Sequence, residues 1–288
     1  MKRMSISSWI AMAIVFTSIS FFGCSQDRVA PTSEVLVSDE IKANFTELGF
    51  DVSDIQAIQA GNELTGFTQE RAYLLENCIK VTQKQMEEML ASEVEKLGPN
   101  GEQYRTSNLV SSPRTITVIG YTGGSFALDN TMRTALQWAV NNYNRLNIGL
   151  NFQLSFGTNY QNKDITVYRV SGSGGGSAGF PSGGDPYGFV QIQSGTSSFG
   201  TNVVEHVITH EIGHCLGFRH TDYFNRSISC GSGGNEGSAG VGAIHIPGTG
   251  TTTSSSGFDF NSIMLACFSA NEDGEFSSQD ITALEFLY

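Results

Sequence analysis

The feature of this sequence that most constrains its fold is a run of three histidines, His210, His214 and His220. The first two are four residues apart on a strongly helical segment, 202–216, so their side chains lie on one face about one turn apart. Gly217 is placed to end that helix in a left-handed conformation, which turns the chain and returns His220 to the same point. The spacing predicts a zinc ion held by three histidines, with a fourth position open.

Glu211 follows the first of these histidines and supplies the chemistry of a hydrolase. On the same helical turn, its carboxylate can reach a water on the metal without being a ligand, as a general base requires. Zinc lowers the pKa of such a water to about 7, and Glu211 then passes the proton to the leaving amine. We therefore expect an endopeptidase with one catalytic zinc ion (Zn2+) that hydrolyses a protein or peptide substrate.

The complete run from His210 to Asp222 matches the pattern HExxHxxGxxHxD, the extended zinc signature of the metzincin clan. A bare HExxH arises by chance, but the correctly spaced glycine and third histidine make this signature specific. The His-Glu-Ile-Gly-His wording and the stretch 244–249 resemble the family of dual-action HEIGH metallopeptidases. The resemblance covers residues 115–288 and implies peptidase activity without indicating a substrate.

Metzincins also have a methionine turn beneath the zinc, and the run 261–264 resembles it, which assigns Met264 to the turn. The resemblance implies that its thioether packs under the imidazoles as an apolar floor; the alternative is one of seven methionines in an ordinary core. Astacin-like members have a glutamate and a tyrosine where this chain has Thr221 and Ala266, so no tyrosine is assigned to the metal. Asp222 pairs with a newly cut N-terminus, fixes the helix exit or is an ordinary loop carboxylate.

The second half of the chain predicts an α+β fold of the metzincin type in residues 106–288. Alternating and β-branched runs indicate strands, and amphipathic runs indicate helices. Strands are expected at 115–119, 152–156, 165–170 and 189–192, and helices at 128–146, 202–216 and 277–288. This order implies a twisted mixed β-sheet with packed helices, above an irregular lower part from Phe218 onward. We expect an extended substrate to pair with a sheet edge at 189–192.

The first residues are typical of an export signal. A basic start precedes an apolar run, 9–22, that is too short to span a membrane comfortably and ends near Cys24. This ending resembles the bacterial lipobox, so we expect a lipoprotein signal peptide over 1–23 and lipidation of Cys24; an ordinary signal peptide is the alternative. A tether over 24–37 follows. The protein is then an outer-membrane or cell-surface lipoprotein held by a lipid anchor, or is released outside.

Residues 38–105 are predicted to form a small helical region. Caps at 38–40 and 53–54 each begin a short helix, and a longer helix is expected over 69–97. The region is either an inhibitory prosegment, removed by a cut in an exposed linker over 100–112, or a permanent accessory domain. The first interpretation makes the protein a zymogen.

Cys78 lies within the expected long helix and allows two interpretations. Thiolates bind zinc well, so Cys78 can act as a switch that fills the open metal position until the prosegment is cut away. On the apolar stripe of a helix, however, a buried cysteine is a common structural residue. Cys215, Cys230 and Cys267 lie in the second half, where we expect one disulfide and prefer Cys230 with Cys267.

Charge and spacing count against several other sites. A formal net charge of −12 without a basic stripe argues against nucleic-acid binding. Separately, we expect the protein to be a monomer. The acidic run 271–275 invites a calcium site but lacks the ligand series of an EF-hand. His206 shares a face with the zinc ligands, yet its ligation would leave His220 unexplained, and no spacing makes His245 a ligand.

Two other classes of function stay open from the sequence. A catalytically silent, zinc-containing surface lipoprotein that binds an envelope or host polymer would keep the histidines but would not need Glu211. A metal hydrolase acting on a non-peptide amide or ester would use the same residues, and only a panel of substrates separates it from a peptidase.

Overall fold

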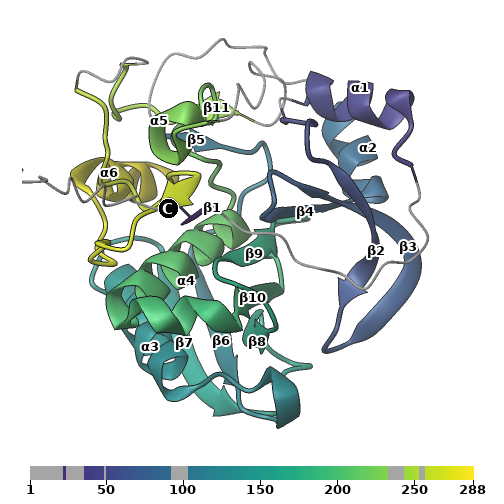
Figure 1. The fold of residues 1–288 in the computed structure, drawn as a ribbon. Helices are drawn as coiled ribbons and strands as arrows, with labels where there is room; N and C mark the ends of the chain where they lie inside the picture. The colour runs from purple at the N-terminus through teal and green to yellow at the C-terminus, as the bar shows by residue number, and fades with distance from the viewer. Residues whose placement is uncertain (1–21, 24–35, 49, 92–102, 233–242, 253–256) are drawn as a thin grey trace, which may run out of the picture.

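The structure, a computed structural model, describes residues 22–23, 36–48, 50–91, 103–232, 243–252 and 257–288. They fold into an α+β protein, as expected (Figure 1). Residues 22–23 are described by their backbone alone, and Cys24 with most of the expected signal peptide and tether lies outside the described residues. No helix in the described stretches has both the length and the apolar character needed to cross a membrane.

One mixed sheet runs through the molecule, with its strands in the order β2-β3-β4-β9-β10-β8-β6-β7 (Figure 1). The strands are β2 (Gln56–Asn62), β3 (Gly66–Leu75), β4 (Ile79–Thr82), β6 (Arg114–Tyr121), β7 (Leu150–Gly157), β8 (Ile165–Val170), β9 (Gly176–Gly179) and β10 (Phe189–Gln193). Neighbours among β7, β6, β8 and β10 are parallel, whereas β9 is antiparallel to β10. The four strands predicted for the second half are confirmed as β6, β7, β8 and β10.

Two long helices, α3 (Asn130–Asn144) and α4 (Thr201–Leu216), pack against each other and against the sheet (Figure 1). α3 begins where the side chain of Asp129 accepts a hydrogen bond from the Met132 amide (2.9 Å), as N-caps do. Every residue of α4 from Val203 to Leu216 is buried. A helix enclosed on all sides is fixed by the core, so the histidines that it carries are held in place.

The N-terminal region, residues 36–91, is only partly helical, so the helix predicted over 69–97 is wrong. α1 (Asp39–Glu47) forms as predicted, but the residues expected to form the second helix belong to β2. β3 and β4 form an antiparallel hairpin, followed by α2 (Gln83–Ala91). The apolar side chains of the hairpin pack with those of α1 and α2 into a separate small core, and this packing overrides helix propensity.

The hairpin connection, residues 76–78, contains a β-turn whose central residues are Glu76 and Asn77, and both have left-handed backbone conformations, with φ of 55° and 59°. The Cys78 amide donates to Leu75 O across the turn (3.1 Å). Turns in which both central residues are left-handed are usually recognised in a sequence by Asn-Gly or Asp-Gly. This turn has no glycine to mark it in the sequence. The apolar residues on its two sides have helical spacing and therefore predicted a helix instead.

β10, the strand expected to receive a substrate, is not at the edge of the sheet, so that prediction is wrong. It lies between β8 and β9, so within the C-terminal part, residues 103–288, β9 forms one edge of the sheet and β7 the other. β9 has the sequence Gly-Ser-Ala-Gly, which has low strand propensity and escaped prediction. β4 pairs with β9 in parallel, Ile79 opposite Ala178 and Lys80 opposite Gly179. The N-terminal hairpin thus covers this edge.

The linker expected to be exposed over 100–112 is exposed at Ser111 and Ser112, but its first described residues are packed into the C-terminal part. Gln103, Tyr104 and Thr106 are buried. The Gln103 side chain donates to Ser262 Oγ (3.0 Å), and β5 (Tyr104–Arg105) pairs with β11 (Ile244–His245). A cut that frees the N-terminal region without disturbing these contacts must fall before Gln103.

Short elements and one disulfide complete the C-terminal part. The short elements are η1 (Gly124–Phe126), η2 (Ser194–Phe199), α5 (Ser227–Cys230) and β12 (Cys267–Phe268), which pairs with β1 (Phe22–Gly23). Cys230 and Cys267 form a disulfide with Cα atoms 5.1 Å apart, which is the pairing preferred from the sequence. The last helix, expected at 277–288, is α6 (Ser278–Leu287) and begins with a capping box.

Candidate metal centre

The end of α4 brings the three histidines of the motif together, with ring centroids 4.6–5.3 Å apart. Gly217 ends the helix with φ of 113°, and its amide donates to the carbonyls of Gly213 and His214. The Phe218 amide also donates to Gly213 O (3.0 Å), which completes a Schellman-type helix end. A Cβ added at Gly217 would lie 2.6 Å from a backbone oxygen. The turn that returns His220 to the helix therefore requires glycine.

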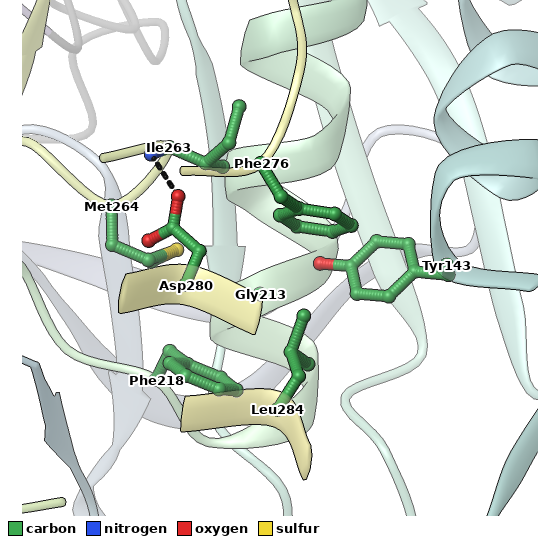
Figure 2. A pocket seen from close by; sticks show the side chains of 8 residues that line it. All are labelled: Tyr143, Gly213, Phe218, Ile263, Met264, Phe276, Asp280 and Leu284. Atoms are coloured by element: carbon green, nitrogen blue, oxygen red, sulfur yellow. Dashed lines mark hydrogen bonds between the residues drawn. The ribbon is translucent and has the colours of Figure 1, made fainter. Parts of the chain in front are cut away.

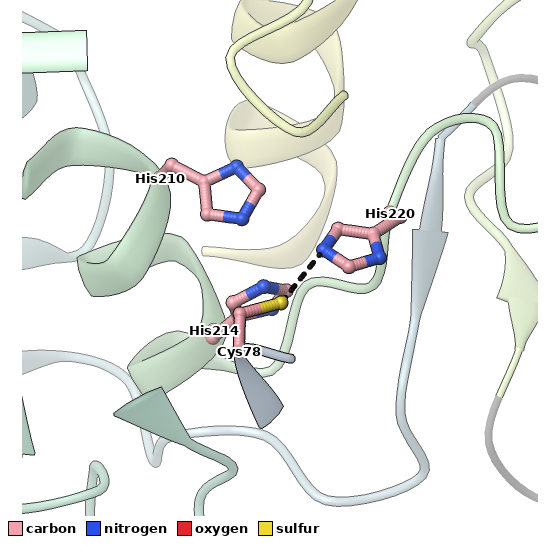
Figure 3. A group of neighbouring side chains, drawn as sticks. All are labelled: Cys78, His210, His214 and His220. Carbon is pink, nitrogen blue, oxygen red and sulfur yellow. Dashed lines mark hydrogen bonds between the residues drawn. The ribbon is translucent and has the colours of Figure 1, made fainter. Parts of the chain in front are cut away.

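Each imidazole is held at its Nδ1 atom, so the Nε2 atoms turn toward a common centre (Figure 3). His210 Nδ1 lies 2.8 Å from Ile263 O. His214 Nδ1 lies 2.8 Å from Phe218 O, and His220 Nδ1 has a carboxylate oxygen 3.3 Å away. These acceptors place the hydrogen on Nδ1 and the lone pair on Nε2. Nε2 of His210 and of His214 has no hydrogen-bond partner among the described residues, as expected of atoms that bind a metal.

Cys78 reaches the same centre from the N-terminal hairpin (Figure 3). Its Sγ lies 3.4 Å from His220 Nε2, and the ligand atoms of Cys78 and the three histidines all lie within 4.8 Å of one another. In tetrahedral zinc, with bonds of about 2.0 Å to nitrogen and 2.3 Å to sulfur, neighbouring ligand atoms are about 3.5 Å apart. Donor set and spacing therefore fit a buried zinc ion. Cys78 belongs both to the N-terminal core and to this centre.

The environment of the centre keeps at least one ligand in the form that binds metal. Burial first, and then the neighbouring His210 and His220, lower the pKa of His214 well below its usual value. The ring is therefore neutral at physiological pH, and its Nε2 lone pair is available to an ion.

Glu211 lies on α4 next to His210 and is fully buried. β9 passes close to it at Gly176, where an added Cβ would lie 2.8 Å from both Cγ and Oε1 of Glu211. A small pocket adjoins the pair, and its lining includes the apolar side chains of Leu265 and Phe268. The Glu211 carboxylate thus borders a space beside a metal ligand, which suits a general base.

Met264 lies against α4, where a methionine turn would place it (Figure 2). It is buried, and an added Cβ at Gly213 would come 2.5 Å from its Sδ. The Thr221 amide donates to Met264 O (2.8 Å), which ties the turn to the segment after the third histidine. Asp280 of α6 accepts a hydrogen bond from the Ile263 amide (2.8 Å) and so anchors the turn from the other side (Figure 2).

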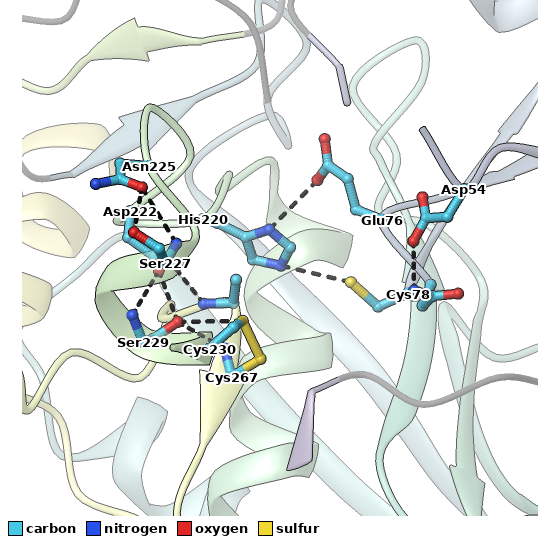
Figure 4. The surroundings of a disulfide bond; sticks show 12 residues. Asp54, Glu76, Cys78, His220, Asp222, Asn225, Ser227, Ser229, Cys230 and Cys267 are labelled. Carbon is cyan, nitrogen blue, oxygen red and sulfur yellow. Dashed lines mark hydrogen bonds and ion pairs between the residues drawn. A yellow bond between two sulfur atoms is a disulfide. The ribbon is translucent and has the colours of Figure 1, made fainter. Parts of the chain in front are cut away.

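A buried ion pair beside the centre, Glu76 with Arg219, was missed in the sequence. Glu76 Oε1 lies 3.1 Å from an Arg219 nitrogen. Glu76 Oε2 lies 3.3 Å from His220 Nδ1, the contact that Figure 4 shows. Burial alone would raise the pKa of Glu76, but Arg219 first and then His220 outweigh it and lower the pKa to about 2. The partners are 143 positions apart, so no local spacing could connect them.

Asp222 fixes the loop that follows the third histidine, one of the roles expected for it (Figure 4). Its carboxylate accepts hydrogen bonds from Ser229 Oγ (2.6 Å) and from the Ala266 amide (2.9 Å). The loop is thereby joined to the segment that follows Met264 and to the disulfide-bonded segments.

The remaining candidates lie apart from the centre. His206 Nδ1 is 3.6 Å from Glu272, and His245 Nε2 is 3.0 Å from Thr249 Oγ1. Within the acidic run considered for calcium, Glu272 pairs with His206 and Glu275 pairs with Arg145. Among the described residues, the three histidines with Cys78 are the one group that has metal-ligand spacing.

Glu205 anchors the N-terminal half of α4 and should make stability depend on pH. Its Oε1 accepts a hydrogen bond from the Asn142 side chain (2.8 Å), and its side chain is 3% exposed. Burial first, and then the Glu275 carboxylate, raise its pKa from 4.5 to about 7. A raised carboxyl pKa means that the folded state binds the proton more tightly, so this contribution to stability is present below about pH 4.5 and is lost as pH rises through about 7.

Replacing Glu205 with glutamine should remove this dependence, because glutamine keeps an acceptor for Asn142 and does not ionise. The difference in free energy of unfolding, variant minus wild type, should be about 1–3 kcal/mol larger at pH 8 than at pH 4. Urea unfolding of both proteins across this pH range measures the difference. Parallel pH profiles for the two proteins would contradict the assignment.

Comparison with known proteins agrees with this site. A family model described as dual-action HEIGH metallo-peptidase matches residues 73–288, a range that includes the hairpin turn and Cys78. Two solved structures of myroilysin are similar to the chain. One has 15% identity and a TM-score of 0.40, covering 63% of this chain and 96% of that chain. The other has 17% identity and a TM-score of 0.34, covering 59% and 81%. A search of curated proteins found no match.

Proposed function

Since the chain belongs to the dual-action HEIGH metallopeptidase family, we propose that it is a zinc-dependent endopeptidase made in a latent form. The observation that carries the proposal is the buried group of three histidines and Cys78, whose ligand atoms lie within 4.8 Å of one another. The histidines are the protein ligands of a catalytic zinc site, and the thiol fills the position that catalysis leaves to water. The site thus contains the parts of a peptidase together with the group that silences it.

Zinc, when bound, acidifies a water ligand and polarises the peptide carbonyl. Glu211 accepts a proton from the attacking water and passes it to the leaving amine, a role favoured by its place beside His210. β9 offers its edge to the main chain of the peptide once β4 has left it.

The N-terminal region acts as a prosegment because it occupies two parts of the site at once. β4 is paired with the edge of β9, and Cys78 lies in the group that would hold the metal. Removal of this region requires a cut between Ala91 and Gln103. The chain up to Ala91 is packed in the N-terminal region, and Gln103 is hydrogen-bonded within the C-terminal part. Such a cut leaves the three histidines, Glu211 and Met264 together in the C-terminal part.

Replacing Gly176 with alanine should reduce activity while zinc binding persists. The new methyl group would lie 2.8 Å from the Glu211 side chain and 3.0 Å from Gln191 O, so carboxylate or strand must shift. Displacing a catalytic group by about 1 Å costs up to roughly 100-fold in rate, and we expect a fall of about 10- to 100-fold in kcat/KM. Gly188→Ala is the matched control, because its Cβ would lie 3.6 Å from the nearest atom. Equal activity of the two variants would contradict the placement of Glu211.

Export by a lipid anchor on Cys24 also belongs to the proposal and is supported by the sequence of the first residues. Incorporation of labelled fatty acid into the wild type, and its loss in Cys24→Ala, would support an outer-membrane or surface lipoprotein. A soluble exported product with no label would favour an ordinary signal peptide.

The function is tested with the exported chain, carrying a site for a specific protease inserted after Gly101, before and after the cut. The cut protein, separated from its N-terminal region, should degrade an unfolded protein, lose this activity on chelation and regain it with zinc. If it binds zinc but cuts no protein, the silent surface protein becomes the better account. Hydrolysis confined to a panel of non-peptide esters and amides would instead identify the second alternative.

A further inference from the structure

Arg219 is a charged residue for which the metal centre has no evident use. It directly precedes the ligand His220 and is fully buried. Its amide donates to Tyr104 O (2.8 Å), and its guanidinium lies 6.0 Å from the ring of Tyr223. These contacts come from the C-terminal part, so they persist when the N-terminal region is removed.

Two further contacts of the Arg219 guanidinium come from the N-terminal region. Glu76 Oε1 lies 3.1 Å away, and the ring of Phe50 lies 4.3 Å away. Both side chains leave with the prosegment. The guanidinium nitrogen that donates to Glu76 then loses this acceptor, and another carboxylate can take the same position.

Glu76 occupies a position that a glutamate does not favour. It is the first central residue of the β-turn 75–78 and has φ of 55°, a conformation that suits Asn or Gly. Such strain is typical of functional sites, and here it delivers a carboxylate to Arg219 two residues before the metal-facing Cys78. The turn therefore presents an acidic side chain beside the metal, in a place that a substrate would fill.

We propose that Arg219 determines specificity in the active enzyme by binding a carboxylate of the substrate where Glu76 lies in this structure. This inference rests on the proposed function. The preferred substrates have an acidic side chain within two residues of the cleaved bond. A C-terminal carboxylate offers the same chemistry, and the test separates these two sources. The forked guanidinium suits a carboxylate better than a lysine would, because it can donate two parallel hydrogen bonds.

The experiment uses enzyme activated from the full chain by the inserted protease site. Three peptides share one sequence: amidated with Glu beside the cleaved bond, amidated with Gln there, and Gln with a free C-terminus. Cleavage gives kcat/KM for each peptide, and fluorescence anisotropy gives its Kd for the activated Glu211→Gln protein. The same measurements are made on Arg219→Gln, on Arg219→Lys and on Arg145→Gln, which removes an exposed arginine paired with Glu275.

We expect kcat/KM to be at least about tenfold higher, and Kd at least about tenfold lower, for the Glu peptide than for the amidated Gln peptide. This is the size of effect expected for one charge-assisted hydrogen bond. The ratio should approach one in Arg219→Gln, fall part of the way in Arg219→Lys and persist in Arg145→Gln. If Arg219→Gln does not fold, raising the salt concentration should lower the ratio for wild-type enzyme, since a charge pair opened to solvent is screened.

Several results would overturn the inference. One is that the Glu and amidated Gln peptides bind with Kd values within about twofold of each other. Another is that the preference for the Glu peptide survives Arg219→Gln or does not respond to salt. Preference for the free C-terminus alone would replace the acidic side chain with a terminal carboxylate. If the Glu peptide binds through Arg219 but no peptide or protein is cut, the peptidase function fails while the carboxylate site stands.

Discussion

Replacing Cys78 with alanine should raise the peptidase activity of the uncut full-length chain by at least about tenfold, because the metal position opens in a larger fraction of molecules. In the structure the Cys78 sulfur lies 3.4 Å from His220 Nε2, within the spacing of one ion. Alanine cannot bind the metal, so that position becomes accessible to water. Activity of the uncut variant on a short peptide, compared with the uncut wild type, measures the gain.

The gain should stay below that produced by removing the N-terminal region, because the thiol is only one of its contacts. β4 remains paired with β9, and Glu76 remains paired with Arg219. Adding Glu76→Gln to Cys78→Ala should therefore increase activity further. Cys215→Ala is the matched control: this cysteine is also buried and outside the disulfide, but it is not in the ligand group, so the variant should stay latent.

Cobalt substitution tests the same contact without an activity assay. A thiolate on Co2+ produces a charge-transfer absorption, which should be present in the full-length wild type and absent from Cys78→Ala and from the cut enzyme. Absence of this band in the wild type, or a latent Cys78→Ala variant that retains its metal, would show that strand pairing rather than the thiol maintains latency.

The parts of the site that lie close together in sequence were the parts that sequence could predict. His210 and His214 share a helix face by their spacing, and a glycine at 217 predicts the reversal that brings back His220. The strands before them have β-branched, alternating sequences that agree with their place in the sheet. Local propensity and tertiary packing point to the same structure in these elements.

The N-terminal region was misread because its tertiary contacts oppose its local pattern. Leu74, Leu75 and Cys78 are spaced as on a helix, and the turn at Glu76 and Asn77 contains no glycine to mark it. Phe180, from the C-terminal part, completes the core that holds the hairpin. Phe180 lies 99 positions after Val81, the closest hairpin residue in that core, so this partner cannot be read from the hairpin itself.

The blocked sheet edge and the ion pair were also missed because they leave no local pattern in the sequence. β9 is glycine-rich, because Gly176 must let Glu211 approach, and glycine removes the pattern by which strands are recognised. Arg219 appears in the sequence as one more residue between two histidines of a motif. Its partner Glu76 becomes evident only when the hairpin is folded against the metal centre.

Replacing Glu211 with glutamine should lower kcat/KM of the cut enzyme by about 100- to 10,000-fold, the usual contribution of a general acid–base group. Glutamine has nearly the same shape, so it should fit beside Gly176 as the carboxylate does. It cannot accept the proton of the attacking water. Because Glu211 is outside the ligand group, the variant should bind one zinc ion as the wild type does. Kinetics and metal analysis on the same preparation measure both effects.

Glu205→Gln is the matched control for this variant, since it makes the same change on the same helix. Glu205 faces Asn142 rather than the pocket beside the metal, so its replacement should leave kcat/KM close to that of the wild type. Loss of activity in both variants would indicate damage to α4 and not loss of a base. An active Glu211→Gln enzyme would assign proton transfer to another group. A zinc-loaded wild type that is as inactive as the variant would favour the silent surface protein, which has no need of Glu211.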